Sequence, residues 1–311
     1  MRLANTFDES RNVLRSGDHR PMSMAMEYRS VGERLGIDFS PTVRFLELMP
    51  VFMDGAEHKR VRAAMARIMS SSRERQELAV QRSVSESAFH FAQAGQVELL
   101  RDLIRPMWLA VSAAITGPDT RLRDLTIAVP SLFCCHLRLQ ERIRINSLLS
   151  ETFAEAADAD ELMTVLGLAS LGMGPLTGSM ALSLHHVLSK QTGRYLGEIE
   201  WPESFQVSAL EVTDRLSASE DDTVRCVLHS KNFSGAENAE LLFGGGIHLC
   251  LGKAISLHAW KVVTSMLARA PTRIETVALD LRYQPAASEH DFTLIQDPFL
   301  RPRAVEVLLE T

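Results

Sequence analysis

A glycine-rich run that ends in a cysteine is the feature of this sequence with the clearest chemical meaning. Residues 243–252 read FGGGIHLCLG and lead directly into a helical pattern over residues 253–269. Glycine lets the backbone approach a flat ligand without obstruction by a Cβ atom. Just before a helix, the Cys250 thiolate would be stabilised by the helix dipole and by free backbone N–H groups. Such a thiolate is a good ligand for haem iron, and the side chain of His248 could reach an anionic group on the same ligand.

This run resembles the haem-binding loop of cytochromes P450. In that family the loop reads Phe, two residues, Gly, one residue, Arg or His, one residue, Cys, one residue, Gly. Every fixed position is met, by Phe243, Gly246, His248, Cys250 and Gly252. A buried structural cysteine beside a glycine turn is the alternative, and so many correctly spaced matches disfavour it. The resemblance implies that Cys250 binds the iron of haem b, iron protoporphyrin IX, and that the other residues belong to the cofactor site.

A basic helical stretch and one arginine extend the resemblance. Residues 54–62 (DGAEHKRVR) are similar to the start of the family's C helix, where a His and an Arg four residues apart contact the haem propionates. His58 and Arg62 match them, and this spacing puts both on one helix face. Arg215 matches an arginine that faces a propionate from the strand after the family's K helix. Without the cysteine loop, the basic face would be read as solvated and Arg215 as an ordinary surface residue.

The central apolar stretch, residues 162–188, is similar to the family's I helix, which crosses the haem face where oxygen binds. There an acid followed by a threonine helps deliver protons to oxygen. The best register puts Thr177 at the threonine, Gly174 at the preceding glycine and Leu176 at the acid, so the carboxylate is lost. Pro175 is expected to kink the helix. Thr177 and Gly174 are thus the candidate catalytic residues, and the alternative for Thr177 is an ordinary helical position.

The sequence also departs from the family pattern. The K helix normally carries Glu, two residues and Arg, whereas the matching place upstream of Arg215 holds Glu203 and Gln206. The family's N-terminal β segment has no evident counterpart, because the chain opens near the B helix at residues 7–14. We therefore expect residues 1–311 to form a single haem-binding domain that is truncated and divergent, of the bacterial type, and lacks this β segment.

The elements that must position these residues are mostly helical. Helical patterns cover residues 55–70, 71–93, 97–117, 122–157, 162–188 and 253–269, and strand patterns cover residues 223–228, 292–295 and 304–309. No repeat or low-complexity linker divides the chain. With 46% hydrophobic and 23% charged residues, it can bury a substantial core. We predict a mainly α fold with a minor β component, a shortened cytochrome P450-like fold.

Charge and composition exclude several classes of partner. A net charge of −6 argues against nucleic acid, which would require a basic face. The first twenty residues are polar and mixed in charge, without the pattern of a signal peptide, and no apolar window reaches the length that a bilayer needs. No membrane partner is expected. The cysteines at positions 134, 135, 226 and 250 lack metal-finger spacing and indicate a reducing, cytoplasmic compartment.

The resemblance implies a haem-thiolate oxidoreductase, a monooxygenase or peroxygenase acting on a small organic substrate in a specialised-metabolite pathway. The oxidant would be oxygen with an electron donor, such as a ferredoxin, or peroxide, which depends less on the lost acid at Leu176. One alternative is atypical haem catalysis, in which iron acts as a Lewis acid in dehydration, rearrangement or bond formation on a nitrogen-containing substrate. The other is a haem-binding scaffold without turnover, which the replaced arginine at Gln206 favours.

Overall fold

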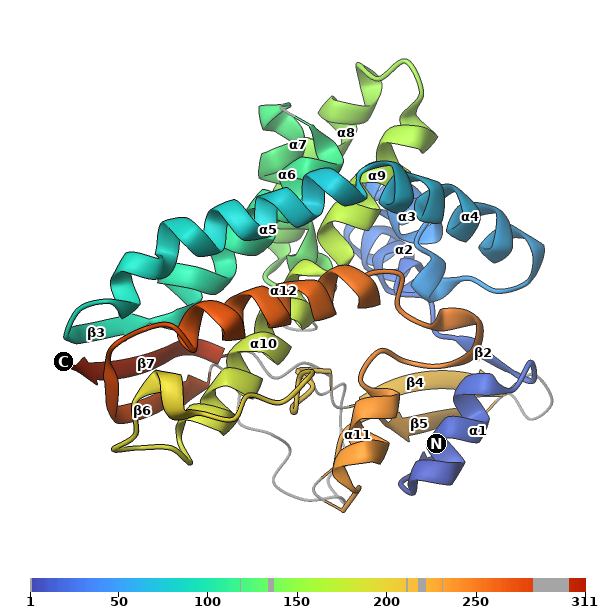
Figure 1. Cartoon of the computed structure of the whole chain (residues 1–311). Helices are drawn as coiled ribbons and strands as arrows, with labels where there is room; N and C mark the ends of the chain where they lie inside the picture. The colour runs from blue at the N-terminus through green and yellow to red at the C-terminus, as the bar shows by residue number, and fades with distance from the viewer. Residues whose placement is uncertain are drawn as a thin grey trace.

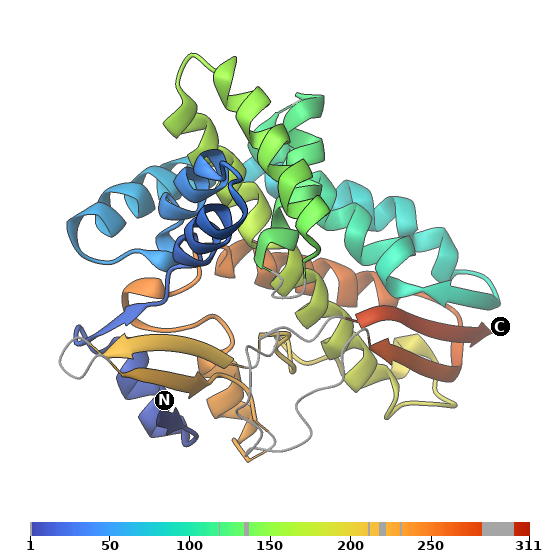
Figure 2. The same cartoon turned by 180° about the vertical axis from the view of Figure 1, so that it is seen from behind.

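A helical body and two small β sheets make up the molecule (Figure 1). This computed structural model describes residues 2–117, 119–133, 137–210, 212–217, 222–230, 232–281 and 302–311. The sheets lie toward opposite ends of a long helix, α12 (Lys253–Leu267), as Figures 1 and 2 both show. The described residues are mainly α with a minor β component, which confirms the predicted fold class.

Most of the predicted helical stretches form helices, although several are shorter than their patterns. The first half of the chain contains α1 (Phe7–Arg15), α2 (Ala25–Leu35), α3 (Ser40–Glu47), α4 (Gly55–Ser71), α5 (Arg73–Ser87), α6 (Arg105–Thr116), α7 (Thr120–Ala128) and α8 (Leu139–Ala154). The pattern over residues 97–117 yields an α-helix only from Arg105, because the strand β3 (Gly95–Glu98) and a π-helical turn, Leu100–Ile104, come first. A capping box between Thr6 and Glu9 fixes the start of α1.

The central apolar stretch folds as two helices, α9 (Ala159–Leu171) and α10 (Met173–Leu188), which a turn at Gly172 separates. The single helix predicted over residues 162–188, with a kink at Pro175, is therefore interrupted instead at Gly172. Pro175 lies in the first turn of α10, where its missing N–H removes no helical hydrogen bond. The N–H of Leu176 donates to the carbonyl of Gly172 at 2.9 Å. Where a kink at Pro175 is expected, the structure has one helix ending and a second beginning on either side of Gly172.

The run Ala159–Leu188 would be long and apolar enough to cross a membrane, judged by length and composition alone. The expectation that no apolar window reaches this length is therefore wrong. Of its most apolar window, however, 50% is buried inside the molecule, and the core helix of a soluble protein passes the same test. This run is therefore weak evidence for a membrane span. The absence of a membrane partner stays a prediction.

The first sheet carries Arg215 and has the strand order β1-β5-β4-β2. Its strands are β1 (Arg2–Ala4), β2 (His19–Pro21), β4 (Val212–Ser217) and β5 (Thr223–Val227). Arg215 pairs with Val224 on one side and with Pro21 on the other. The strand predicted at residues 223–228 is confirmed. The short strand β1, which runs parallel to β5, was not expected ahead of the first helix.

The second sheet has the order β3-β7-β6, with β6 (Arg273–Leu281) and β7 (Pro302–Glu310) antiparallel. It confirms the strand predicted at residues 304–309. The strand predicted at residues 292–295 and the cysteines at positions 134 and 135 lie outside the described residues.

The predicted K-helix match at Glu203 and Gln206 is wrong, because residues 199–209 form neither helix nor strand. Pro202 has no N–H, and the N–H groups of Gln206 and Val207 donate to the hydroxyl of Ser183 in α10 instead of to carbonyls one helical turn back. A short helix, α11 (Gly235–Leu241), then leads into the cysteine loop and α12.

Two clusters of buried apolar side chains meet near the cysteine loop. The larger cluster draws on α5, α6, α10 and α12 and contains Trp260 and Phe205, both about 1% exposed or less. The smaller one draws on α2, α3, α7, α8 and α9 and contains Tyr28. Cys250 packs against the first cluster and Leu251 against the second, so the end of the loop lies at their junction.

Candidate functional site

The cysteine loop has a backbone conformation that requires its glycines. Gly244 and Gly246 have φ values of +74° and +58°, in the left-handed region that favours glycine. A Cβ atom on Gly246 would lie 2.7 Å from the carbonyl oxygen of Leu14 in α1. Gly246 therefore permits close packing on α1, and close approach to a flat ligand is not needed to explain it. The N–H of Cys250 donates to the carbonyl of Phe243 at 2.8 Å and closes the loop.

Replacing Gly246 with alanine is expected to lower the free energy of unfolding by about 1–3 kcal/mol, because the Cβ would strain φ and clash with Leu14. Urea unfolding measures the change. Gly235→Ala is the matched control, since a Cβ at Gly235, in the first turn of α11, has nothing within 4 Å. We expect the control to be neutral or to stabilise by about 0.5–1 kcal/mol. Equal losses of stability in both variants would contradict the role given to Gly246.

The thiol of Cys250 lies just before α12, with Gly252 at the N-cap of that helix. Burial raises the pKa of the Cys250 thiol, while hydrogen bonds from the backbone at Gly252 and Lys253 and the charges of Arg62 and Lys253 act to lower it. Cys250 is half-buried, and its thiol faces groups that stabilise a negative charge on sulfur. A cation bound at the sulfur would lower the pKa of the thiol further and favour the thiolate.

Histidine and arginine side chains from α4 reach the cysteine loop, as predicted. His58 is 1% exposed, and the centroid of its ring lies 4.7 Å from that of His248. Arg62 donates a hydrogen bond to the carbonyl of Leu249 in the loop. Burial lowers the pKa of His248 to about 4, with further contributions from Arg215, His58 and Arg62. The four predicted propionate ligands therefore lie close enough to act on one another.

Arg215 in β4 is the most deeply buried of these arginines, at 6% exposed, and burial lowers its pKa. Its guanidinium donates to the hydroxyl of Thr213 at 3.1 Å and to the carbonyl of Asp214 at 3.3 Å. The Asp214 carboxylate accepts two hydrogen bonds at 2.8 Å from Arg225. Within the described ranges, no carboxylate forms an ion pair with His58, Arg62, Arg215 or His248, so this basic cluster suits an anionic ligand.

Unpaired buried polar atoms also fit a ligand at this place. In the part of the chain that the structure describes, neither ring nitrogen of His58 has a hydrogen-bond partner, and the hydroxyl of Thr177 in α10 has none. Buried polar groups are normally paired. A group that carries carboxylates and a metal ion would match the basic cluster, the His58 nitrogens and the Cys250 thiol together. Haem carries both, so the residues present fit it.

The two predicted catalytic residues, Thr177 and Gly174, lie in α10 and differ in their surroundings. Thr177 has a buried hydroxyl, whereas a Cβ on Gly174 would meet no atom within 4 Å. Leu176 and Met173 pack against the same apolar cluster as Cys250, which places this part of α10 beside the core that supports the thiol. The described contacts do not join Thr177 or Gly174 directly to Cys250, so their catalytic roles stay predictions.

Sequence reasoning missed several residues around the loop. A depression at the surface is lined by His58, Lys59, Arg62, Ala63, Ala66, Ile247 and Leu251. Ile247 and Leu251 occupy the variable positions of the loop, where a motif gives no signal, but the helical repeat of α4 could have indicated Ala63 and Ala66. This depression lies where α4 meets the cysteine loop, since these two elements supply its lining.

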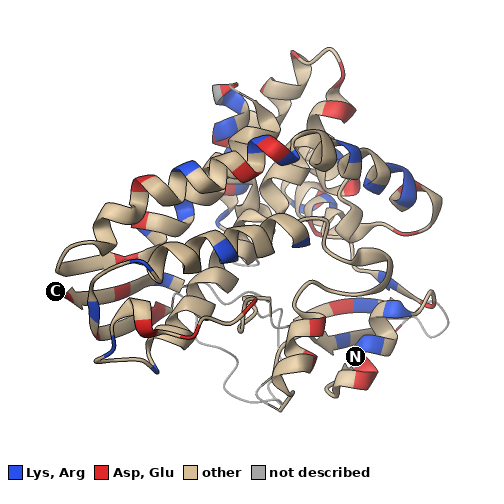
Figure 3. Cartoon of the chain, viewed as in Figure 1, with Lys and Arg blue, Asp and Glu red and all other residues tan. Residues whose placement is uncertain are grey.

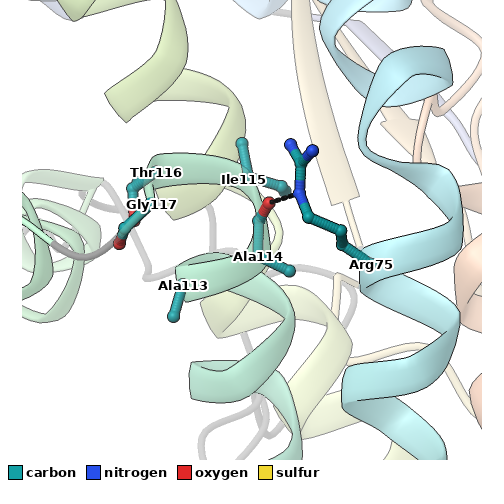
Figure 4. A pocket seen from close by; sticks show the side chains of 6 residues that line it. All are labelled: Arg75, Ala113, Ala114, Ile115, Thr116 and Gly117. Atoms are coloured by element: carbon teal, nitrogen blue, oxygen red, sulfur yellow. Dashed lines mark hydrogen bonds between the residues drawn. The ribbon is translucent and has the colours of Figure 1, made fainter.

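A second depression lies away from this site, at the end of α6 (Figure 4). It is lined by Arg75 and residues 113–117, and the Nε of Arg75 donates to the carbonyl of Ala114 at 3.3 Å. An arginine at this position satisfies a free carbonyl at a helix C-terminus and opposes the negative end of its dipole. None of the predicted site residues lines this depression, and Arg75 has a sufficient role in holding α6.

Comparisons of the sequence identify no relatives: no model of a known family and no curated protein matches this chain. Comparisons of the structure find proteins of similar fold. P450BioI, in a complex with acyl carrier protein ligated to hexadec-9Z-enoic acid, has a TM-score of 0.68 at 12% identity, and the match covers 99% of this chain and 91% of that one. The cytochrome P450 CYP109B1 from Bacillus subtilis has a TM-score of 0.65 at 15% identity, with 98% and 92% covered.

A thermophilic cytochrome P450 from Sulfolobus tokodaii has a TM-score of 0.63 at 14% identity, with 99% of this chain and 94% of that chain covered. In each case nearly the whole chain aligns with the neighbour, although few residues are identical. Likeness of this kind establishes the fold, which agrees with the resemblance in the cysteine loop. The chain therefore has a divergent cytochrome P450-like fold, with the cysteine motif placed at the start of α12.

Proposed function

We propose that this protein is a haem-thiolate oxidoreductase that oxidises a small organic substrate. The observation that carries the proposal is the convergence of a half-buried cysteine, Cys250, with a basic cluster that lacks a carboxylate partner among the described residues. A P450-like fold supports it, because the structural neighbours are cytochromes P450 by name. The cofactor that we propose is haem b, with Cys250 as the ligand of the iron.

The chain's own residues would divide the work as follows. His58, Arg62, Arg215 and His248 would hold the two propionates by charge and hydrogen bonds. The start of α12 and Lys253 would keep the sulfur ionised, since they already act to lower its pKa. When bound, the haem would supply oxidising chemistry at its iron. The Thr177 hydroxyl would donate a hydrogen bond or pass a proton on the substrate side.

The oxidant in this proposal is peroxide, or oxygen with electrons from a ferredoxin-type donor. Leu176 favours peroxide, because an apolar side chain cannot relay the protons that oxygen activation needs. Lys59, Arg62 and Lys253, which lie in or beside the loop, would attract an acidic donor. A cytoplasmic location and a role in a specialised-metabolite pathway belong to the same proposal.

Atypical haem catalysis is the second candidate, and Leu176 is the observation that favours it. Without a carboxylate on this side, iron would serve as a Lewis acid in dehydration, rearrangement or bond formation on a nitrogen-containing substrate. A haem-binding scaffold without turnover is the third candidate. It is favoured by residues 199–209, which form no K helix and hence no internal ion pair of the family type.

The test is the spectrum of the purified protein after reduction and addition of carbon monoxide. A thiolate-ligated haem is expected to give a strongly red-shifted Soret band. Mixing the ferric protein with peroxide then tests the oxidative branch, which predicts a rapid spectral change and turnover of an added organic reductant. Failure of haem to bind, even when it is added to the folded protein, would refute the proposed function.

A further inference from the structure

A segment that is neither helix nor strand takes the place where the resemblance predicts a K helix. Residues 202–210, which we name the strap, run along α10. The hydroxyl of Ser183 accepts from the N–H groups of Gln206 at 3.0 Å and Val207 at 2.9 Å, and one turn earlier the hydroxyl of Ser179 accepts from Ala209 at 2.9 Å. Ser183 is 0% exposed and Ser179 is 5% exposed. On this side, the strap is thus held by hydrogen bonds to two buried hydroxyl side chains of α10.

The other side of the strap contacts the elements that carry the cysteine loop. The strap residue Phe205 is 1% exposed, and its ring lies edge-on to Trp260 of α12, with the centroids 5.2 Å apart. The Phe205 ring also lies 6.3 Å from that of Phe243, the first residue of the loop. The indole N–H of Trp260 donates to the carbonyl of Pro202 at 2.7 Å. The strap therefore connects α10 to Phe243, at the start of the cysteine loop, and to Trp260, in the helix that follows the loop.

We infer that Ser183 is a positioning residue for Cys250 and acts through the strap. Its hydroxyl fixes Gln206 and Val207, which holds Phe205 against Phe243 and Trp260. The carbonyl of Phe243 in turn accepts from the N–H of Cys250 at 2.8 Å. Each step is a packed ring pair or a hydrogen bond to a buried acceptor residue, Ser183 or Phe243, and such contacts transmit displacement because protein interiors are close-packed. The same contacts tie α10, which carries Thr177, to the thiol side of the site.

This inference rests on the proposed function for its chemical meaning, but its central experiment does not need haem. Ser183→Ala removes the hydroxyl and leaves the N–H groups of Gln206 and Val207 without their acceptor on α10. Hydrogen–deuterium exchange with peptide-resolved mass spectrometry is measured on the full chain as purified. We expect exchange to become faster by roughly tenfold both in the strap and in residues 243–250, because their local opening is coupled.

Ser170→Ala is the matched control. Ser170 is also a helical serine with 0% exposure, but its hydroxyl bonds only to carbonyls within α9, at Leu166 and Gly167. We expect this variant to leave exchange in the strap and in the cysteine loop unchanged. Faster exchange in the strap of Ser183→Ala with an unchanged cysteine loop would overturn the inference. So would equal effects of both substitutions on the loop.

Ser179→Ala provides the same test with a milder change, because it removes a single acceptor, and it replaces Ser183→Ala if that variant does not fold.

In haem-loaded protein, the reduced carbon monoxide spectrum adds a second measurement. Ser183→Ala is expected to shift part of the Soret intensity from the thiolate position toward that of a neutral thiol, and Ser170→Ala is not. If the protein binds no haem, the proposed function fails while the exchange result still decides the role of Ser183.

Discussion

Replacing Cys250 with serine is expected to abolish the red-shifted Soret band of the reduced carbon monoxide complex. Serine keeps the size and the hydrogen-bonding capacity of the side chain, but its hydroxyl stays protonated where a thiol can ionise. The groups that act to lower the pKa of Cys250, namely the backbone at Gly252 and Lys253 and the charge of Arg62, would then have no sulfur anion to stabilise. We expect the remaining haem to show a band typical of a neutral or nitrogen ligand, and its retention to fall by at least about tenfold.

Cys226→Ser is the matched control, because it makes the same substitution at a second described cysteine. Cys226 lies in β5, is 0% exposed, and burial raises the pKa of its thiol to about 11. Such a thiol stays protonated at neutral pH, so the control should leave the position of the band unchanged even if some stability is lost. An unchanged band in Cys250→Ser would show that another side chain holds the iron.

Features set by neighbouring residues were predictable from the sequence. The cysteine loop is a contiguous motif, and His58 with Arg62 follows from the repeat of one helix, so the structure brings these residues together as expected. Arg215 required only that its strand lie beside the loop, and the charge of Arg215 is close enough to His248 to lower the pKa of that ring. In each case the signal was local in sequence or was carried by the family resemblance.

Features that depend on distant partners were not predictable. Residues 199–209 form no helix, and the N–H groups of Gln206 and Val207 donate instead to the hydroxyl of Ser183, a residue more than twenty positions away. The three-residue strands β1 and β2 are too short to show a pattern, and they exist because β5 and β4 offer edges to pair with. The sequence predicts a kink at Pro175, whereas the break lies at Gly172. A proline indicates that a helix is interrupted nearby, but it does not determine at which residue the next helix begins.

Replacing Arg215 with methionine is expected to have opposite effects on the haem-free and the haem-bound protein. The guanidinium is buried, and its described hydrogen bonds end on uncharged oxygens, at Thr213 and at the backbone of Asp214. A buried charge without a counter-ion costs free energy, so methionine should stabilise the haem-free protein by about 1 kcal/mol or more. Bound propionates would supply the missing counter-ion, so the same change should weaken haem binding by about 3 kcal/mol, roughly a hundredfold in Kd.

Thermal unfolding of the haem-free protein and transfer of haem to an excess of a haem-scavenging globin measure the two effects. Arg225→Met is the control on the neighbouring strand, where Arg225 pairs with Asp214 in the sheet and in an ion pair at 2.8 Å. Breaking that pair leaves a carboxylate uncompensated, so the control should destabilise the haem-free protein. If Arg215→Met also lowers stability and leaves haem transfer unchanged, then Arg215 is a structural residue of the sheet. A rise in stability together with faster haem loss would instead mean that the fold carries this buried charge for the sake of an anionic ligand.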